Sequence, residues 1–247
     1  MPLMRLDKLL GDMGIASRSE LKQMIKRGRV TVDGRAVTAP ETKVDSEGSS
    51  IALDGEELRY KSFHYYMMDK PAGVLSATED GKQKTVLDLV SPEMRRMGLF
   101  PVGRLDKDTE GLLLLTNDGN LTHKLLSPKY HVDKVYYARV EGCLETSDIE
   151  AFAAGMVLGD GLVCLPAGLE ILSDHEALVT LQEGKFHQVK RMLACRGKPV
   201  QYLKRLRMGP LILDEKLPCG AFRPLRTEEI EVLRTECSID RMTKNRQ

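Results

Sequence analysis

The stretch Gly103-Arg104-Leu105-Asp106-Lys107-Asp108-Thr109-Glu110-Gly111, followed directly by Leu112-Leu113-Leu114-Leu115-Thr116, is the most informative part of this chain. The four leucines form an apolar run of the length of a buried strand. The charged segment before them is bounded by glycines, which is typical of a loop. A loop anchored by a buried strand holds its side chains in fixed positions, as a catalytic group requires. Asp106 is therefore a candidate catalytic residue; the plain alternative is a solvated loop carboxylate or a helix cap.

Length and composition limit the possible folds. The chain has 247 residues, of which 42% are hydrophobic, enough for one large domain or for a small and a medium one. No run approaches the ~20 apolar residues that a membrane-spanning helix needs, and the N-terminus lacks the apolar core of a signal peptide. We therefore expect a soluble, cytoplasmic protein.

The cysteines and histidines do not form a metal-binding or disulfide pattern. The five cysteines are scattered and include no Cys-x-x-Cys pair: Cys143, Cys164, Cys195, Cys219 and Cys237. The five histidines show no His-Glu-x-x-His spacing. We expect reduced thiols, and neither a metal nor another cofactor.

Residues 1–60 are expected to form a domain of their own. Apolar residues recur at helical spacing in 5–13, and Ser17 with Glu20 forms a capping box that opens a second helix. Short strands are expected at 30–32 and 51–53. Basic residues recur on one face of the second helix and just beyond it, at Arg18, Lys22, Lys26 and Arg29. Such a row is either solvated surface or a contact surface for RNA.

Residues 61–235 alternate strand-like and helix-like segments. Strands are expected at 64–68, 112–116, 135–140, 168–172, 177–181, 200–206 and 211–213. Helices are expected at 121–126, 146–154 and 187–196. Strand runs broken by isolated helices favour an α+β fold over a strict βαβ repeat. The polar residues 236–247 are expected to form a disordered tail.

Two further segments carry informative side chains. Asp69-Lys70-Pro71-Ala72-Gly73-Val74 reads as a strand end followed by a Pro/Gly turn, which indicates a structural role. In Lys134-Val135-Tyr136-Tyr137-Ala138-Arg139-Val140, strand alternation sends the two tyrosines to opposite faces. Only one of them can therefore enter a site.

A third segment begins a basic stripe. In Glu183-Gly184-Lys185-Phe186-His187-Gln188-Val189-Lys190-Arg191-Met192-Leu193, a helix would bury Val189, Met192 and Leu193 and place His187, Lys190 and Arg191 on its other side. From Lys185 to Arg207 there are eight Lys or Arg residues and no Asp or Glu, in a protein whose net charge is only +1. Such a stripe binds phosphates locally without making the whole protein a polycation.

Together these segments and the Asp106 loop resemble the motifs of the pseudouridine synthases, specifically the branch that modifies ribosomal RNA. The first sixty residues resemble the small RNA-binding domain named after ribosomal protein S4. The resemblance covers nearly all of residues 4–233. It implies an S4-like domain at 1–60 and, at 61–235, a synthase domain with a mixed, mainly antiparallel sheet. The implied reaction isomerises a uridine to pseudouridine without a metal or cofactor.

The resemblance assigns catalytic roles to three residues. Asp106 matches the nucleophile; aspartates are ionised at neutral pH, so it needs orientation and a dry pocket, not a general base. The family pattern Lys-x-Tyr selects Tyr136, which would stack on uracil and take part in the proton loss from carbon 5; the alternative is a core aromatic. Lys190 matches the basic partner of the aspartate, where many synthases carry arginine with its bidentate geometry.

The resemblance also suggests RNA contacts. Arg104 matches a wedge that fills the space left by a flipped-out uridine; the alternatives are a phosphate contact or a salt bridge to Asp108 or Glu110. Besides the row on the second helix, the other expected RNA contacts are Lys185, His187, Arg191 and Arg205, and Lys70 is expected to lie near the RNA.

The substrate expected from the resemblance is one uridine of small-subunit (16S) ribosomal RNA, free or in assembling particles, modified by a monomeric enzyme. Residues 185–192 look more like the small-subunit enzymes than the large-subunit ones, which tend to carry arginine at the positions of His187 and Lys190. Three alternatives stay open: the same reaction on large-subunit (23S) RNA, a non-catalytic assembly factor, and an aspartate-nucleophile hydrolase. The intact Asp106, Tyr136 and Lys190 set argues against the second, and the lack of a second working carboxylate argues against the third. Attack at the base and attack at the ribose also both stay open.

Overall fold

The computed structural model of the chain describes residues 3–236. The tail expected at 236–247 therefore lies outside the described residues, apart from its first residue. No helix in the described part of the chain is long and apolar enough to cross a membrane.

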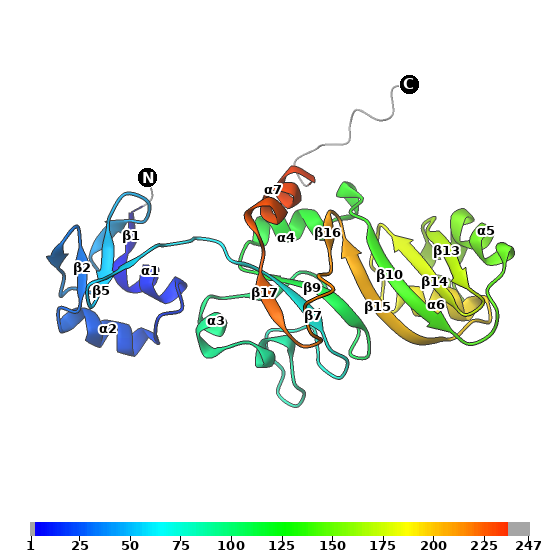
Figure 1. Cartoon of the computed structure of the whole chain (residues 1–247), viewed down its shortest axis with the longest axis horizontal. Helices are drawn as coiled ribbons and strands as arrows, with labels where there is room; N and C mark the ends of the chain where they lie inside the picture. The colour runs from blue at the N-terminus through cyan, green and yellow to red at the C-terminus, as the bar shows by residue number, and fades with distance from the viewer. Residues whose placement is uncertain (1–2, 237–247) are drawn as a thin grey trace, which may run out of the picture. The chain divides into compact units, whose positions relative to one another are not determined.

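The chain forms two compact units, which are described here one at a time (Figure 1). The first contains Met1–His64 together with Val90–Phe100, and the second contains Tyr65–Leu89 together with Pro101–Gln247. The segment Val90–Phe100 thus groups with the first unit, although the sequence places it within residues 61–235.

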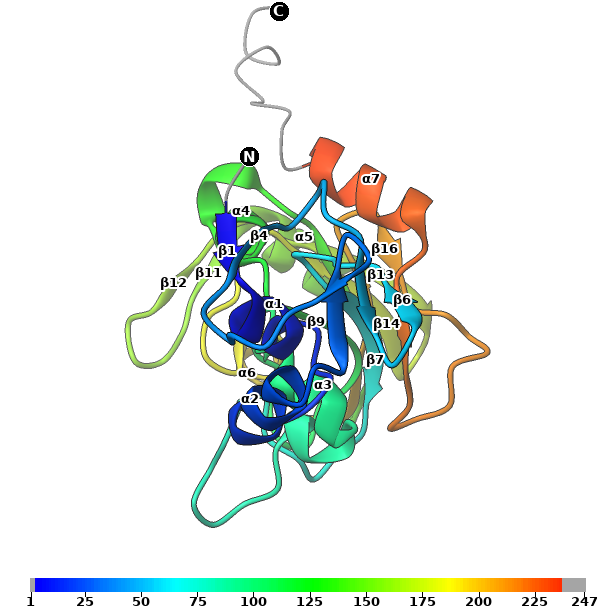
Figure 2. The ribbon, with the colours of Figure 1, turned by 90° about the vertical axis from the view of Figure 1, so that its left-hand side faces the viewer.

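The first unit combines short helices with a small antiparallel sheet (Figures 1 and 2). Its helices are α1 (Leu6–Asp12), α2 (Arg18–Lys26) and α3 (Pro92–Arg96). The sheet has the order β3-β2-β5-β6, formed by β2 (Val30–Val32), β3 (Arg35–Ala36), β5 (Ile51–Leu53) and β6 (Glu56–Leu58). A separate pair is formed by β1 (Leu3–Arg5) and β4 (Lys43–Asp45).

The predicted capping box is present at the start of α2. The Ser17 hydroxyl accepts the backbone N–H of Glu20, and the Glu20 carboxylate accepts the backbone N–H of Ser17. Apolar residues from α1 and α2 pack against the strands in one core that includes Leu6, Leu9, Leu10, Leu21, Ile25, Val30 and Ile51. The helices and strands expected for residues 5–53 are therefore confirmed.

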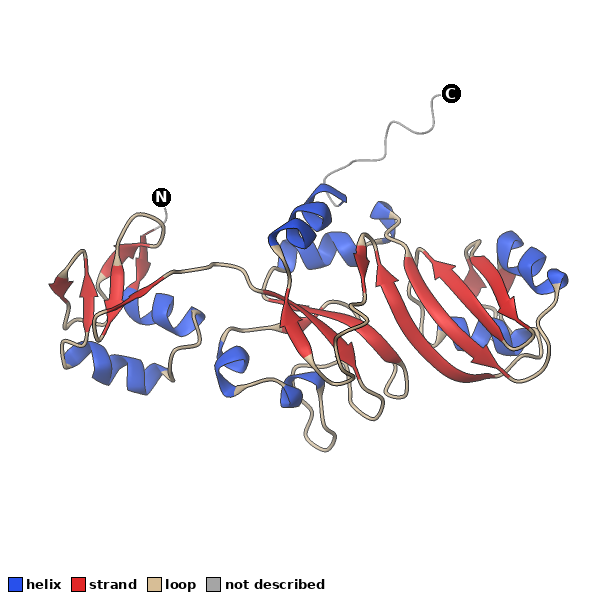
Figure 3. Ribbon diagram, in the orientation of Figure 1, coloured by secondary structure: helices blue, strands red, loops and turns tan. Residues whose placement is uncertain are grey.

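The second unit is built on a nine-stranded sheet, drawn in red in Figure 3. Its main path has the order β13-β14-β10-β15-β9-β7-β17, while β16 pairs with β15 and β8 pairs with β9. The strands are β7 (Tyr65–Lys70), β8 (Phe100–Pro101), β9 (Glu110–Thr116), β10 (Lys134–Val140), β13 (Gly168–Ser173), β14 (Glu176–Leu181), β15 (Val200–Met208), β16 (Leu211–Ile212) and β17 (Phe222–Pro224).

Helices and a short hairpin complete the second unit. They are η1 (Val86–Leu89), α4 (Gly119–Leu126), η2 (Pro128–Tyr130), α5 (Thr146–Ala154), the hairpin β11 (Met156–Val157) with β12 (Val163–Cys164), α6 (Gln188–Cys195) and α7 (Thr227–Glu236). The α+β layout inferred from the sequence is confirmed.

The leucine strand lies in the interior of the sheet. Leu112, Leu113, Leu114 and Leu115 are all fully buried. Their strand, β9, pairs antiparallel with β7 and parallel with β15. The pairs β10–β14, β10–β15, β13–β14, β15–β16 and β7–β17 are also antiparallel. The sheet is therefore mixed and mainly antiparallel, as expected.

One helix boundary differs from the sequence analysis, and two α-helices were not foreseen. Helix α6 begins at Gln188, because His187 adopts a left-handed conformation at its N-cap (φ 51°, ψ 32°) and is not part of the helix. Helix α7 was missed because it buries only Leu233 fully, so it gives almost no apolar periodicity. Helix α3 has only five residues, too few to show a periodic pattern.

Gly111 is required where β9 and β15 come together. Its φ is 103°, a value that residues with a Cβ rarely adopt. A Cβ at this position would lie 2.3 Å from the Arg205 carbonyl oxygen and 2.7 Å from the Arg205 nitrogen. The parallel pairing that begins β9, and with it the end of the Asp106 loop, therefore depends on glycine.

We predict that Gly111→Ala lowers the free energy of unfolding by roughly 2–4 kcal/mol, because it adds backbone strain and forces β15 away. Gly119→Ala is the matched control: it lies at the start of α4, and a Cβ there meets nothing within 4 Å. It should change stability by less than about 1 kcal/mol. Equal denaturation midpoints for the two variants would contradict this account of Gly111.

Candidate active site

Asp106 lies on the loop between β8 and β9, and a buried lysine holds the backbone of that loop. Lys70, the last residue of β7, is fully buried. Its Nζ donates to the carbonyl oxygens of Asp106 (3.1 Å), Thr109 (2.9 Å), Lys107 (3.3 Å) and Pro71 (3.0 Å). A buried ammonium needs such partners, so it orders the carbonyls around it. Lys70 therefore supports the loop from the interior, since no part of its side chain reaches the surface.

The segment that follows Lys70 fastens the loop at further points. The Ser76 hydroxyl donates to the Leu105 carbonyl (2.9 Å) and accepts the Leu105 N–H (3.0 Å). The backbone N–H of Gly73 donates to the carbonyl of Lys107 (2.7 Å). The structural role expected for this Pro/Gly segment is therefore confirmed: it supports the loop that carries Asp106.

Two basic side chains from the α6 region reach the Asp106 carboxylate. Lys190 Nζ lies 3.2 Å from one carboxylate oxygen, and His187 Nε2 lies 3.5 Å from the other. Lys190 also pairs with Asp108 at 2.5 Å. That ion pair holds the pKa of the Asp108 carboxyl below its usual value, chiefly through the hydrogen bond from Lys190. The Asp106 side chain is 24% exposed and the Asp108 side chain 76%, so Asp106 is the more sheltered of the two carboxylates.

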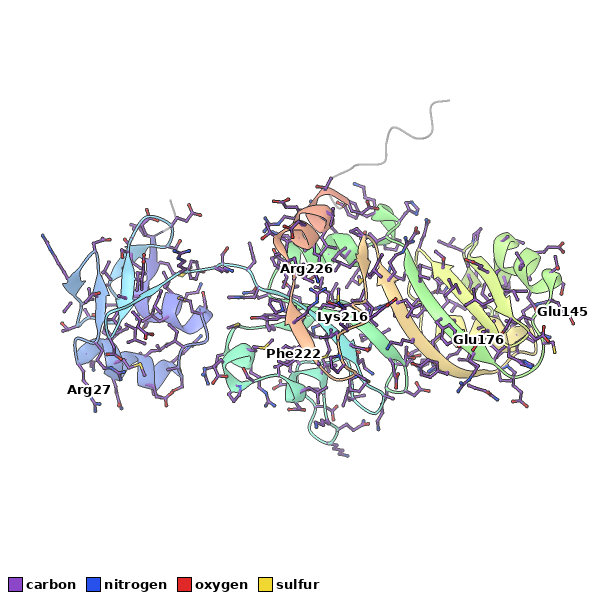
Figure 4. All side chains as sticks on the ribbon, viewed as in Figure 1. Arg27, Glu145, Glu176, Lys216, Phe222 and Arg226 are labelled. Atoms are coloured by element: carbon purple, nitrogen blue, oxygen red, sulfur yellow. The ribbon has the colours of Figure 1, made fainter. Side chains whose placement is uncertain are left out.

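A cavity of about 60 Å³ opens beside Asp106. Strand β10 contributes Tyr136, which is 8% exposed, while Tyr137 on the opposite face donates a hydrogen bond to Glu176, labelled in Figure 4. The strand alternation expected for the two tyrosines is confirmed. The rest of the lining comes from Arg104, Leu105, Thr109, Leu181, Gly184, Lys185, His187, Gln188, Val189 and Leu203. Charged groups thus meet one aromatic ring and several apolar side chains in a single recess.

Glu183 organises the turn that leads into α6. Its side chain is largely buried and accepts the Leu165 N–H (2.9 Å) and the Gln188 amide (2.6 Å), and Lys185 Nζ lies 2.8 Å away. Burial acts to raise the pKa of Glu183, but these hydrogen bonds outweigh it and hold the pKa below its usual value. The position of His187 beside Asp106 depends on this turn.

The side chains expected to contact RNA in the second unit differ in whether they already form contacts within the protein. Arg104 is exposed at the cavity and forms no ion pair within residues 3–236, so the salt bridge to Asp108 or Glu110 is not present. Lys185 donates to the Val163 carbonyl, and Arg191 forms an ion pair with Asp160. Both side chains are therefore already engaged.

Arg205 is a correction to the sequence analysis. It is only 2% exposed and its Nε donates to the Leu112 carbonyl at 2.8 Å. Its side chain faces the sheet interior because Leu203 and Arg205 alternate with half-exposed neighbours on β15. Arg205 braces the start of β9 and does not contact RNA in this fold.

The basic row of the first unit is exposed. Arg18, Lys22, Lys26 and Arg29 all reach the surface, and the first two line a hollow of about 580 Å³ together with Arg5 and Lys8. The Arg29 guanidinium is paired with the Asp54 carboxylate, so part of its charge is neutralised. Arg18 and Lys26 form no ion pair with other described residues.

Sequence reasoning missed several residues that shape the cavity. Thr109 lies in the quoted loop, is 1% exposed, and its hydroxyl has no partner among the described atoms. Glu183 and Gln188 lie in the segment that was interpreted by its cations, so their own roles were not inferred from the sequence. Leu181 and Leu203 come from strands distant in sequence, and only the sheet register brings them to Asp106. Within the described residues, no group of three or more His, Cys, Asp or Glu side chains is placed to hold a metal.

Comparisons with known proteins agree on one family. A family model described as RNA pseudouridylate synthase matches residues 64–195, and one described as S4 domain matches residues 4–50. An uncharacterized RNA pseudouridine synthase of Bacillus subtilis (strain 168) is 46% identical over 93% of this chain and 98% of its own length. The ribosomal small subunit pseudouridine synthase A of Pseudomonas aeruginosa is 44% identical over 92% of this chain and 99% of its own.

Two further comparisons point the same way. The enzyme of the same name from Vibrio cholerae is 41% identical over 92% of this chain and 98% of its own length. A crystal structure titled pseudouridylate synthase superposes with a TM-score of 0.66 at 35% identity, covering 93% of this chain and 99% of that one.

We predict that Lys70→Met loosens the Asp106 loop, because four carbonyl oxygens lose their common donor. Hydrogen exchange of the amides in 104–110 should speed up at least tenfold. Lys107→Met is the control, since Lys107 is exposed and its Nζ donates to no side chain but Gln83 among residues 3–236. Unchanged exchange in Lys70→Met would contradict the proposed support.

The same variant gives a pH test. Burial lowers the pKa of Lys70 to about 8 from an ordinary value of 10.5. Between pH 8 and 10.5 the Lys70 amine binds more protons in the unfolded chain than in the native one. The contribution of Lys70 to the free energy of unfolding therefore rises with pH across this range. The difference in free energy of unfolding between wild type and Lys70→Met should therefore widen from pH 8 to 10.5 by up to roughly 3 kcal/mol. A constant difference would show that Lys70 titrates normally.

Proposed function

We propose that this chain, which belongs to the RNA pseudouridylate synthase family, isomerises one uridine of small-subunit ribosomal RNA to pseudouridine with Asp106 as the nucleophile. The observation that carries the proposal is the cavity at Asp106, where a sheltered carboxylate, a lysine partner and a tyrosine ring meet. Its chemical parts match the needs of the reaction: a nucleophile, a group that orients it, and an aromatic surface for the base.

The proposed reaction changes no oxidation state and consumes no second substrate. The Asp106 carboxylate attacks either the uracil ring or the anomeric carbon of the ribose. The bond from N1 of uracil to that carbon breaks, the uracil turns, and C5 forms the new bond to the ribose. The proton on C5 leaves with help from Tyr136 or water, N1 of the uracil gains a proton, and the bond to Asp106 is released. Product and substrate are isomers, so atoms and charges balance.

Lys190 is proposed to orient Asp106. One Asp106 oxygen lies within 3.2 Å of its ammonium, and the backbone of the same residue is held by Lys70. A nucleophile fixed at both ends loses little further freedom when the substrate arrives, which favours attack. The ammonium also offsets the charge of the carboxylate when a bound base excludes water.

The small-subunit assignment rests on two observations. The relatives from Pseudomonas aeruginosa and Vibrio cholerae are named for the ribosomal small subunit. The sequence of residues 185–192 also favours the small-subunit branch.

The first unit would add affinity for RNA through its exposed basic row, chiefly Arg18, Lys22 and Lys26. The proposal also places the protein in the cytoplasm as a monomer, since all lining residues of the cavity come from one unit of one chain.

The test uses the full-length protein and transcripts of small-subunit and large-subunit ribosomal RNA labelled with tritium at C5 of uridine. Wild-type protein should release tritium from small-subunit RNA, and carbodiimide mapping should locate one pseudouridine there. Asp106→Asn should lower the rate by roughly a thousandfold or more, with RNA affinity within a few-fold of wild type. Asp108→Asn is the matched control and should keep most activity, because its carboxylate faces solvent.

Each other result has a clear meaning. Modification of large-subunit RNA alone would make that RNA the substrate and overturn the small-subunit assignment. Tritium release by Asp106→Asn at near wild-type rate would remove Asp106 as the nucleophile. RNA binding without release by the wild type would favour an assembly factor.

For Lys190 we predict a split between turnover and affinity. Lys190→Met should lower kcat by roughly 100-fold with KM changed less than about threefold, because the lost contact orients the nucleophile. Lys190→Arg should recover part of the rate, since a guanidinium also pairs with a carboxylate. Equal losses in affinity and turnover for both variants would instead make Lys190 a phosphate contact.

A further inference from the structure

Phe186 is the most exposed large apolar side chain described beside the cavity. It is 70% exposed, whereas Gln188 and Val189, two and three residues further along the chain, are buried. Neither the ion-pair network of the site nor the proposed chemistry uses it. A phenylalanine ring this open to water, next to a recess that receives substrate, calls for an explanation.

The ring is exposed on a rigid turn. The Lys185 N–H donates to the Gln188 side chain (3.0 Å), and the Gln188 N–H donates back to the Lys185 carbonyl (3.1 Å). Glu183 holds Gln188 and Lys185 in turn. His187 is in the left-handed region, a conformation that a side-chain-bearing residue adopts only where its surroundings impose it. The backbone on both sides of Phe186 is thus fixed.

The Phe186 ring is also continuous with the nucleophile. It stacks on the His187 ring, with centroids 3.8 Å apart and planes 19° apart. The His187 ring in turn places Nε2 3.5 Å from the Asp106 carboxylate. One face of Phe186 is covered by His187, so the exposure belongs to its other face. A flat apolar face therefore lies one ring away from the residue that would attack the uridine.

The surroundings favour a nucleobase as the occupant of that face. Arg104 is exposed at the same cavity and forms no ion pair within residues 3–236, which suits a contact with the phosphate backbone. Unpaired bases in RNA loops stack on aromatic side chains whatever their sequence, since every base has a flat face. When the target uridine turns into the cavity, its neighbour loses a stacking partner within the RNA.

We propose that Phe186, backed by His187, is a stacking platform for the base of the nucleotide next to the target uridine. The proposal rests on the function proposed above and adds a residue that positions the RNA strand at the site. It makes the enzyme dependent on an unpaired neighbour, which selects uridines in loops or in RNA that is not fully folded. Phe186 does not touch the reacting atoms and is a positioning residue.

The test uses a fragment of ribosomal RNA that contains the uridine modified by the wild-type protein. The adjacent nucleotides on either side are replaced, one at a time, by 2-aminopurine, whose fluorescence falls on stacking, or by an abasic residue. The variants are Phe186→Ala, Phe186→Tyr, and the control Ile212→Ala. Ile212 is 67% exposed, as open as Phe186, and lies on β16 away from the cavity lining.

Phe186→Ala should weaken RNA affinity and raise KM by roughly 5- to 100-fold, as the loss of one stacked base predicts. Phe186→Tyr should stay within about twofold of wild type, and Ile212→Ala should have no effect. At one flanking position, 2-aminopurine should be quenched by wild type and by Phe186→Tyr but not by Phe186→Ala. With an abasic residue at that position, Phe186→Ala should cause no further loss.

Three results would overturn the platform. They are a KM for Phe186→Ala equal to that of Ile212→Ala, a loss independent of the bases at both flanking positions, or a loss in kcat alone. If the wild-type protein modifies no RNA, the proposed function itself fails. If it modifies RNA and Phe186→Ala behaves as the control does, only the platform fails.

Discussion

The candidate site depends on the hydrogen bonds that the buried Lys70 ammonium donates to backbone carbonyl oxygens. A charge removed from water must be surrounded by polar atoms, and here these are three carbonyl oxygens of the Asp106 loop and the carbonyl oxygen of Pro71. Because the Asp106 carbonyl is turned toward Lys70, its carboxylate is left to point at the cavity and at Lys190. The same loop then enters β9, whose buried leucines fix it to the sheet. The geometry of Asp106 is thus set by a cation that is itself fully buried.

Two lysines act on Asp106 in different ways. Lys70 holds its backbone from the interior, and Lys190 holds its carboxylate from the α6 side. Lys190 is shared with Asp108, so the outer carboxylate draws the ammonium partly away from the inner one. A single lysine between two carboxylates offsets their mutual repulsion. A bidentate arginine at this position would bind one carboxylate more firmly.

The sequence was sufficient for whatever depends on local pattern. The leucine strand, the capping box at Ser17 and the helices at 121–126 and 146–154 follow from periodicity and capping, and each is present. Lys70 and Arg205 could not be judged this way, because their burial depends on which strands become neighbours. Arg205 sits between β10 and β9 only through the crossover that makes β15 run parallel to β9. His187 was placed inside a helix because periodicity carries no information on its left-handed φ.

The basic side chains that already form contacts within the protein limit how charge would hold RNA at the cavity. A net charge of +1 leaves little general attraction for phosphates, and several basic residues are already committed: Lys70, Lys134 and Arg205 to backbone carbonyls, and Lys185, Lys190, Arg191 and Arg29 to ion pairs or carbonyls. Counterion release scales with the phosphates that free cations neutralise. With few such cations at the cavity, contacts that do not depend on charge must supply much of the affinity there. An exposed aromatic ring on a fixed turn supplies such a contact, and it acts only on RNA whose bases are unpaired near the target.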